Sequence, residues 1–262
     1  MMAFLRNPLA WHKRYVEKIY DTPANPASVI GRAGHKALEH FYSMPAHAGG
    51  VAKDIATRLG LEYLRAVPDA ELNFGKATSR KAQKAKRSAM EADYLRAIGF
   101  YLARAPRHKV VAVELRGTVP VAGLPLPLTA VSDLVVESRA EPGAVDVVDH
   151  KFVDSFSKGG ATKTLFVMQA LFNYYTVREI TGRGVRRFMV YECKKSRNAD
   201  GRSQLRRYII DYAACEEEFA LFHRLIKDAT AEIARERLWL PNPSDMFEGE
   251  HSFDLYRLGL IE

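Results

Sequence analysis

Four ionisable side chains lie in segments whose other residues are typical of buried strands. They are Glu114, Asp133, Asp149 and Lys151. Because side chains alternate between the two faces of a strand, Asp149 and Lys151 in the segment VDVVDHKF (residues 145–152) share one face with Val147. His150 points to the other face. An acid and an amine in an apolar strand are costly to bury without partners, so they form either an ion pair at a strand edge or part of a reactive site.

The chemistry that these residue types favour is phosphodiester hydrolysis. Asp133 and Asp149 lie in neighbouring strand segments, and the tripeptide EPG (residues 141–143) between them fits a hairpin turn, so both carboxylates are expected at one end of a sheet. Two carboxylates with open space between them suit Mg²⁺ or Mn²⁺, which prefer oxygen ligands. The nearby ammonium of Lys151 would stabilise the charge that grows on an attacked phosphate. Glu114 is either a further acid of this site or part of the polar face of its strand.

The elements that must position these residues follow from the period of the apolar residues. Spacings of three and four predict helices in the first part of the chain, at residues 8–20, 31–42, 50–67 and 88–104. β-rich segments predict an antiparallel meander of strands at residues 109–121, 126–138 and 144–152. After it we expect a helix at 162–180, strands at 186–195 and 204–212, a helix at 216–238 and an irregular tail at 240–262. The simplest prediction is one α/β domain, with a mainly helical section (1–107), a sheet core (108–212), and a C-terminal helix and tail (213–262).

One helix of the second half carries a narrow polar stripe. In the segment at 162–180, Gln169, Asn173 and Thr176 fall on one side of the helix, and aromatic residues crowd the other positions. The stripe faces solvent, or it turns from a buried helix toward a polar site. The sequence leaves both interpretations open.

The charge of the chain indicates a polyanionic partner. The net charge is +8, and residues 75–87 contain six cations and no acid. Such a run is either a solvated face or a surface that follows a DNA backbone. If the run is helical, one side of it presents Lys76, Arg80, Lys84 and Arg87, and Lys81 adds to the same run. We favour DNA contact, with nucleic acid ahead of an anionic membrane because no membrane-lying helix is evident.

Composition narrows the cellular setting. The chain is 47% hydrophobic and 27% charged, which is ordinary for a globular protein, and no window approaches the roughly 18 apolar residues of a membrane span. The first residues are interrupted by cations and do not resemble a secretory signal. The two cysteines, Cys193 and Cys215, cannot form a disulfide framework or a four-thiolate site. We therefore expect a cytoplasmic protein without membrane attachment, and the small size of the chain fits a bacterial or phage-infected cell.

Five segments, in order along the chain, resemble motifs of the PD-(D/E)XK nuclease superfamily, and within it of the RecB-like and CRISPR-associated exonuclease branch. They are FLRNPLAWHKRYV near the N-terminus, GRAGHKALE with Gly31, His35, Leu38 and Glu39 in register, AVSDLVV with Asp133, VVDHKF with Asp149 and Lys151, and MQALFNYY with Gln169. A single such motif occurs by chance, but five in order on the expected elements are fairly specific. The resemblance implies an α/β fold with a restriction-endonuclease-like core, in which helices flank a central mixed β-sheet.

The resemblance also implies a role for each matching residue. The implied ligands for Mg²⁺ or Mn²⁺ are His35, Asp133, Asp149 and the backbone carbonyl of His150, with Glu114 as a further candidate. Lys151 would assist water activation or stabilise the transition state. Gln169 would orient Lys151 or the DNA.

The chain departs from the family pattern in three places. Ser132 replaces the proline of the family name, and Tyr174 lies one position after the tyrosine of a QxxxY pattern, so its contact with DNA is a weaker expectation. Some relatives hold an iron–sulfur cluster with one cysteine before an N-terminal proline and three near the C-terminus. Here Asn7 precedes Pro8 and the C-terminal tail contains no cysteine. Because cluster binding needs thiolates, we expect no iron–sulfur cluster.

The function predicted from the sequence is a metal-dependent deoxyribonuclease, an exonuclease in DNA end processing, recombination or repair. A structure-selective or nicking endonuclease of the same fold is the nearest alternative. A DNA-binding or scaffold protein that retains the fold without cutting is another, and its partner would be a recombination or replication protein. The sequence leaves strand polarity, strand preference and oligomeric state open.

Overall fold

A computed structural model describes the chain apart from residues 1, 19–23, 46–48, 159–163, 236–237 and 241–262. Nearly all of the expected irregular tail therefore lies outside the described residues. The chain divides into two compact units: a larger one of Ala24–Ala122 and Leu126–Phe222, and a smaller one of Met1–Pro23, Gly123–Pro125 and His223–Glu262. A single domain over residues 1–262 stays a prediction.

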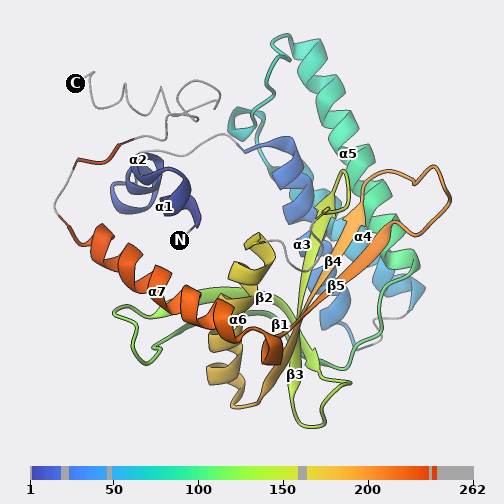
Figure 1. Ribbon diagram of the computed structural model, residues 1–262. Helices are drawn as coiled ribbons and strands as arrows, with labels where there is room; N and C mark the ends of the chain where they lie inside the picture. The colour runs from blue at the N-terminus through green and yellow to red at the C-terminus, as the bar shows by residue number, and fades with distance from the viewer. Residues whose placement is uncertain (1, 19–23, 46–48, 159–163, 236–237, 241–262) are drawn as a thin grey trace. The chain divides into compact units, whose positions relative to one another are not determined.

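The larger unit is built on one five-stranded mixed sheet (Figure 1). Its strands, in spatial order, are β1 (Val110–Val119), β2 (Leu128–Glu137), β3 (Val145–Val153), β4 (Val185–Lys194) and β5 (Leu205–Asp211). The first three form the predicted antiparallel meander, and Gly143 adopts φ +84° in the turn between β2 and β3. The chain then crosses over through α6 (Thr164–Thr181), so β4 pairs parallel to β3, and β5 returns antiparallel to β4.

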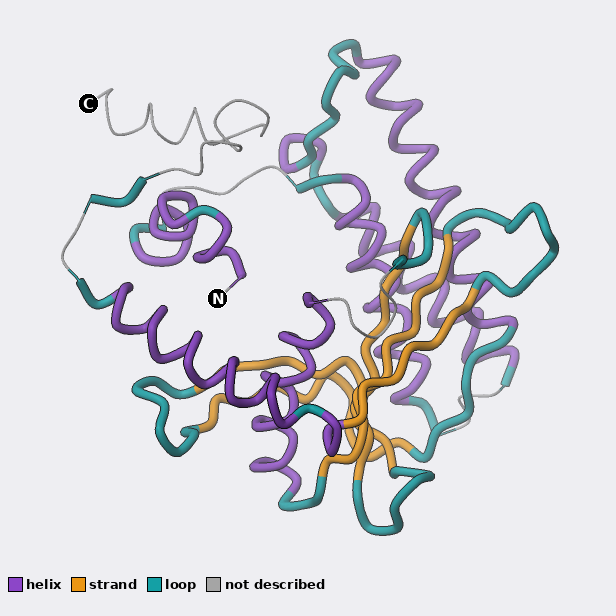
Figure 2. The backbone as a smooth tube through the Cα atoms, viewed as in Figure 1, coloured by secondary structure: helices purple, strands orange, loops and turns teal. Residues whose placement is uncertain are grey.

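Helices cover both faces of this sheet (Figure 2). One face packs against α3 (Pro26–Ser43), α4 (Gly50–Ala66) and α5 (Arg80–Ala103), and its core includes Val148 of β3 and Met189 of β4. The other face packs against α6, where Val147 and Phe188 meet Phe166. Adjacent valines of β3 thus enter different cores, as strand alternation requires. The fold is the expected α/β core, a central mixed sheet flanked by helices.

Two of the helices in this unit begin earlier than the apolar pattern predicted. α3 starts at Pro26, where the side chain of Asn25 accepts a hydrogen bond from the Ala27 amide (2.9 Å). α5 starts at Arg80, where the Ser79 hydroxyl accepts from the Ala82 amide (3.2 Å). Capping side chains set these starts, and as a result part of the basic run becomes the first turns of α5.

The smaller unit contains short helical segments and an aromatic cluster. α1 (Met2–Arg6) is followed by α2 (Pro8–Trp11) and, directly after it, by the π-helix η1 (His12–Val16). The segment predicted as a helix at residues 8–20 is helical from Pro8 to Val16, and its last two residues lie outside the described ones. It widens at His12, because the His12 carbonyl accepts a hydrogen bond from the Glu17 amide five residues ahead (3.0 Å). Phe4, Trp11 and Trp239 pack edge to face or tilted, 5.2–6.0 Å apart. The last helix, α7 (Glu216–Ile233), contributes to both units.

Candidate metal centre

Three potential metal ligands meet where the pairing between β2 and β3 stops, just beyond Leu134 and Val148. His35 of α3, Glu114 of β1 and Asp133 of β2 each offer one ligand atom, and these atoms lie within 4.8 Å of one another. His35 Nδ1 is 3.2 Å from Asp133 Oδ2, and the same oxygen accepts a hydrogen bond from the His150 amide at 2.7 Å. A ring nitrogen with two carboxylates is a donor set that suits a divalent cation such as Mn²⁺ or Mg²⁺.

A glycine next to His35 lets α3 approach the end of β3. A Cβ atom built on Gly34 would lie 2.1 Å from the ring of Phe152, which only a glycine avoids without movement of the ring. His35 packs against the same ring, with centroids 6.5 Å apart. The family motif includes Gly31 and does not mark Gly34. The available signal was a glycine directly before a histidine on the apolar face of a helix.

Glu114 reaches the centre through an unusual backbone conformation. It has φ +48°, in the left-handed region that residues other than glycine seldom adopt. Its neighbours pair as Val113 with Leu134 and Leu115 with Ser132, so Glu114 lies opposite Asp133. Such a conformation costs on the order of 1–3 kcal/mol and persists only where the surroundings impose it. Partial burial and the charge of Asp133 raise the pKa of Glu114. The geometry favours the interpretation of Glu114 as an acid of the site.

Asp149, Lys151 and Gln169 form a second group beside the first. Lys151 Nζ donates to Asp149 Oδ1 at 2.9 Å and to Gln169 Oε1 at 3.0 Å, and the Gln169 amide also donates to Asp149 Oδ1. Asp149 Oδ2 is 2.8 Å from Lys151 Nζ, but no donor of the described residues is aligned to form a hydrogen bond with it. A buried carboxylate oxygen without a hydrogen bond is a position that a cation can fill. Asp149 is nevertheless not a member of the group whose ligand atoms all lie within 4.8 Å of one another.

The charges of the two groups act on each other. Burial and the negative charge of Asp133 raise the pKa of Asp149 to about 6, although Lys151 lowers it. Burial alone would lower the pKa of His35, but the hydrogen bond and the charge of Asp133 raise it overall. The acids thus favour a proton on His35 in the metal-free protein. A divalent cation bound to the ring nitrogen of His35 would compete with a proton there.

His150 lies on the opposite face of β3, as strand alternation predicted. It is 2% exposed, its ring stacks on Tyr42 with centroids 5.8 Å apart, and its Nδ1 is 3.2 Å from the Tyr101 hydroxyl. Burial lowers its pKa to about 3, so the imidazole is neutral near pH 7. The side chain anchors β3 to the helical layer, and its amide orients Asp133. The role of its carbonyl as a metal ligand stays a prediction.

The polar stripe of α6 is buried rather than solvated. Asn173 and Thr176 are 2% and 1% exposed, and the Ser132 hydroxyl contacts Asn173 Oδ1. Gln169 on the same stripe reaches Asp149. Tyr174, one position off the family pattern, packs its ring against Phe219 with centroids 4.8 Å apart. Its contact with DNA stays a prediction.

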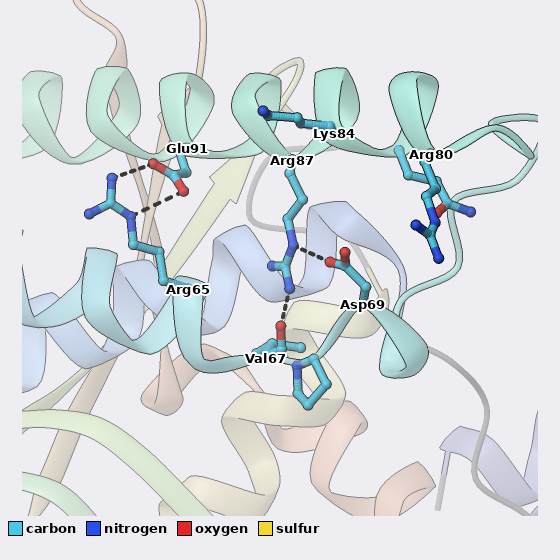
Figure 3. Close-up of a pocket in the computed structure, with 9 residues that line it drawn as sticks. Arg65, Val67, Asp69, Arg80, Lys84, Arg87 and Glu91 are labelled. Atoms are coloured by element: carbon cyan, nitrogen blue, oxygen red, sulfur yellow. Dashed lines mark hydrogen bonds and ion pairs between the residues drawn. The ribbon is translucent and has the colours of Figure 1, made fainter.

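The basic run at residues 75–87 contains cations that bind other parts of the protein and cations that are exposed to solvent. Arg87 donates to Asp69 Oδ1 (2.7 Å) and to the carbonyls of Leu64 (3.1 Å) and Val67, and thereby holds α5 to the end of α4 (Figure 3). It lines a cavity of about 670 Å³ whose other charged residues are Arg65, Asp69, Arg80, Lys84 and Glu91. Lys76 lies before the helix, which begins at Arg80. The exposed cations of the predicted DNA surface are therefore Lys76, Arg80, Lys81 and Lys84.

Two further findings bear on the class of protein. Cys193 and Cys215 are both buried and unbonded to each other. Among the described helices, none has the length and apolar character needed to cross a membrane.

Comparison with known proteins points to one family. The family model described as the PD-(D/E)XK nuclease superfamily matches residues 1–246. No curated protein matches the sequence. Among solved structures, the chain is similar to the one described as the crystal structure of SSO0001, at 12% identity and a TM-score of 0.35, over 94% of this chain and 89% of that one. A TM-score of that size carries no argument about fold or function.

Proposed function

The chain belongs to the PD-(D/E)XK nuclease superfamily, and from this premise we propose that it is a RecB-like, divalent-metal-dependent deoxyribonuclease that shortens DNA from its ends. Membership supports a metal-dependent nuclease that acts on DNA. The observation that carries the proposal is that the His35–Glu114–Asp133 group and the Asp149–Lys151–Gln169 group meet where β2 and β3 stop pairing. A purely structural protein has no need of this arrangement, because burying so many ionisable groups is costly.

The donor set fits a hard divalent cation. His35, Asp133 and Asp149 would hold Mg²⁺ or Mn²⁺, with Glu114 and the carbonyl of His150 completing the ligands. When bound, such an ion polarises both a water molecule and the phosphate that this water attacks. Asp149 Oδ2, which pairs with Lys151 but accepts no hydrogen bond from the described residues, supports this assignment, as does the raised pKa of His35.

Lys151 and Gln169 would act on the phosphate and on its nucleophile. The ammonium of Lys151 is held by Asp149 Oδ1 and Gln169 Oε1, within 3.0 Å of each. From this position it would donate a hydrogen bond to a non-bridging phosphate oxygen and stabilise the growing negative charge. Gln169 would act as a positioning residue, because its amide contacts Asp149 and its carbonyl contacts Lys151.

DNA would reach this site along the basic side of the chain. The exposed cations Lys76, Arg80, Lys81 and Lys84 would contact phosphates, and Arg87 would support them by fixing α5 to α4. Contacts of this type carry no sequence information, which suits an enzyme that degrades DNA during end processing, recombination or repair.

An assay on DNA of different topology tests the proposal. Purified protein with Mg²⁺ or Mn²⁺ should degrade end-labelled linear DNA and leave covalently closed circles intact. Cutting of circles would identify the nicking or structure-selective endonuclease instead. If wild type cut no DNA with either metal, the chain would be a DNA-binding or scaffold protein of a recombination or replication assembly.

Two variants test the site itself. Lys151→Met and Asp133→Asn should each lower the cleavage rate by at least about a hundredfold, since each removes a group that stabilises the transition state. Lys109→Gln, which removes an exposed cation paired with Glu137 (3.3 Å), is the control and should cut as wild type does. Full activity in either site variant would remove that residue from the active site.

A further inference from the structure

A row of charged side chains continues from the candidate metal centre across the sheet to β5. Lys151 of β3 is in register with Glu192 of β4, and Glu192 is in register with Arg206 of β5. Residues paired in this way direct their side chains to the same face of the sheet. Adjacent strands lie about 4.8 Å apart, so the backbone of Arg206 lies about 10 Å from that of Lys151. Arg206 therefore shares the face and the sheet end of the active site.

The acid in this row forms no ion pair with Arg206 among the described residues. Glu192 is 1% exposed, and its Oε2 accepts hydrogen bonds from the Ser157 amide (2.8 Å) and the Tyr208 hydroxyl (3.2 Å). Its Oε1 accepts from the Ser157 hydroxyl. Both oxygens of Glu192 are thus occupied in fixing the segment that follows β3. Among the described parts of the chain, Arg206 forms no ion pair with a carboxylate.

Instead, Arg206 and a second cation gather on one aromatic ring. The Arg206 guanidinium lies 4.2 Å from the centroid of the Phe156 ring, and the Lys194 ammonium lies 5.8 Å from the same centroid. Lys194 also donates to Asn198 Oδ1 at 2.7 Å, a neutral partner. Two cations held beside one ring repel each other. An anion between them would relieve that repulsion.

The surrounding backbone holds these groups in place. Ser157, next to Phe156, is fixed by Glu192, and the Lys194 amide donates to the Gln204 carbonyl at 2.8 Å to close the connection between β4 and β5. Within that connection, Asn198 Nδ2 donates to the Ser203 carbonyl at 2.9 Å. A site that is ordered before its ligand arrives loses less entropy on binding.

Charge around the β4–β5 connection is strongly unbalanced. Residues 194–207 contain six cations and one acid, Asp200. Asp154, from the segment after β3, pairs with Lys195 (2.7 Å), and Asp200 lies 3.5 Å from Arg202. The cations of this segment that the described carboxylates leave unpaired are Lys194, Arg197, Arg206 and Arg207. Because β3 and β4 are parallel, this connection and the end of β3 leave the sheet on the same side (Figure 1).

We infer that Lys194 and Arg206, held by Phe156, bind the sugar–phosphate backbone of the DNA strand that enters the active site. This inference rests on the proposed function. One strand of duplex DNA advances about 3.4 Å per phosphate along the helix axis, so a cation about 10 Å from Lys151 lies within reach of phosphates a few positions from the attacked bond. A polyanion fits better than a single anion because Arg197 continues the positive charge along the connection.

Salt-dependent binding of DNA tests this contact. The double variant Lys194→Gln/Arg206→Gln is compared with wild type for a fluorescent oligonucleotide, single- and double-stranded, in EDTA so that no cutting occurs. Loss of two phosphate contacts should lower the slope of log affinity against log salt by about 1.8 for duplex and about 1.4 for a single strand. For duplex DNA, the Kd of the double variant divided by the Kd of wild type should therefore fall about tenfold between 50 and 200 mM salt.

The matched control removes the same charge elsewhere. Arg58→Gln/Lys109→Gln loses two exposed cations that are paired with Glu62 (3.7 Å) and Glu137 (3.3 Å), and it should bind DNA as wild type does. Arg206→Lys, which keeps the charge, should keep the slope. If the double variant does not fold, Arg206→Gln alone should still lower the slope for duplex DNA by about 0.9.

The outcomes separate this inference from the proposed function. Wild-type slope and affinity in a folded Lys194→Gln/Arg206→Gln variant would refute the contact, and the nuclease would stand if wild type cuts DNA. Conversely, a wild type that cuts nothing but loses its salt slope in this variant would refute the nuclease and keep the contact. Polyglutamate and unlabelled DNA are also compared as competitors at equal concentrations of charge. If polyglutamate displaced the labelled DNA at a lower concentration of charge, the surface would bind an acidic protein, and the inference would be overturned.

Discussion

Replacement of Asp149 by Asn should stabilise the metal-free protein. Burial and the charge of Asp133 raise the pKa of Asp149 to about 6, whereas an unfolded aspartate titrates near 3.8. Its contribution to stability is therefore fully present below pH 3.8 and is lost as the pH rises through 6. Since one pKa unit corresponds to about 1.4 kcal/mol, the ionised carboxylate costs about 3 kcal/mol above pH 6. The Asn side chain has the same shape and carries no charge, so Asp149→Asn avoids that cost.

Urea denaturation in EDTA measures the effect. At pH 8 we expect Asp149→Asn to exceed wild type by about 3 kcal/mol in free energy of unfolding, with a difference that shrinks below pH 6 and vanishes near pH 4. Asp146→Asn, in the same strand, is the matched control. Asp146 is 1% exposed and accepts two hydrogen bonds from Arg187 (2.6 and 3.2 Å), so its replacement should destabilise the protein. If Asp149→Asn lost as much stability at pH 8 as Asp146→Asn, the burial argument would be wrong.

Metal should narrow the difference in stability between wild type and Asp149→Asn. Mn²⁺ at a hundred times its Kd stabilises a folded protein by about 2.7 kcal/mol. Wild type should gain this amount, and Asp149→Asn should gain less, because it lacks one ligand oxygen. An equal gain in both proteins would remove Asp149 from the ligand set and leave His35, Glu114 and Asp133.

Three further predictions follow from packing and burial. Gly34→Ala should lose about 1–3 kcal/mol of stability, because its Cβ would clash with Phe152 of β3. Gly31→Ala should gain about 0.5–1 kcal/mol, because its Cβ meets nothing within 4 Å. Thermal unfolding of the two variants measures the difference. Arg87→Met should lower the free energy of unfolding by about 2 kcal/mol, because it leaves carbonyls at the end of α4 without a donor. Lys84→Met, at an exposed position, should lower it little. Equal losses in urea unfolding would show that Arg87 does not hold α5 to α4. The pKa of His150 is lowered to about 3, so wild type should lose stability as the pH falls from 6.5 toward 3, by at most about 1.4 kcal/mol per pH unit. In acid denaturation, His150→Phe should lack this contribution.

Local patterns in the sequence were enough to predict the elements of the site. Alternation along β3 placed Asp149 and Lys151 with Val147 and turned His150 away, because side-chain direction in a strand depends only on the residue's position in it. Helical spacing likewise placed Gln169 and Asn173 on one stripe. The antiparallel meander followed from the turn residues between its strands. The family motifs added that these elements belong together.

Contacts between distant segments required the tertiary structure. Glu114 joins the site because a left-handed backbone conformation brings it opposite Asp133, and neither local propensity nor spacing predicts that conformation. Arg87 binds the end of α4, a contact that depends on how two helices cross, and its predicted contact with DNA stays a prediction.

The row from Lys151 to Arg206 likewise depends on strand order and register. It needs the parallel pairing of β3 with β4 and the antiparallel return of β5. By itself, the sequence determined which residues are reactive and which face of its own element each occupies, because both are local properties. Only the tertiary structure decided which of them share a site, because pairing across a sheet and packing between helices join residues that are far apart in the chain.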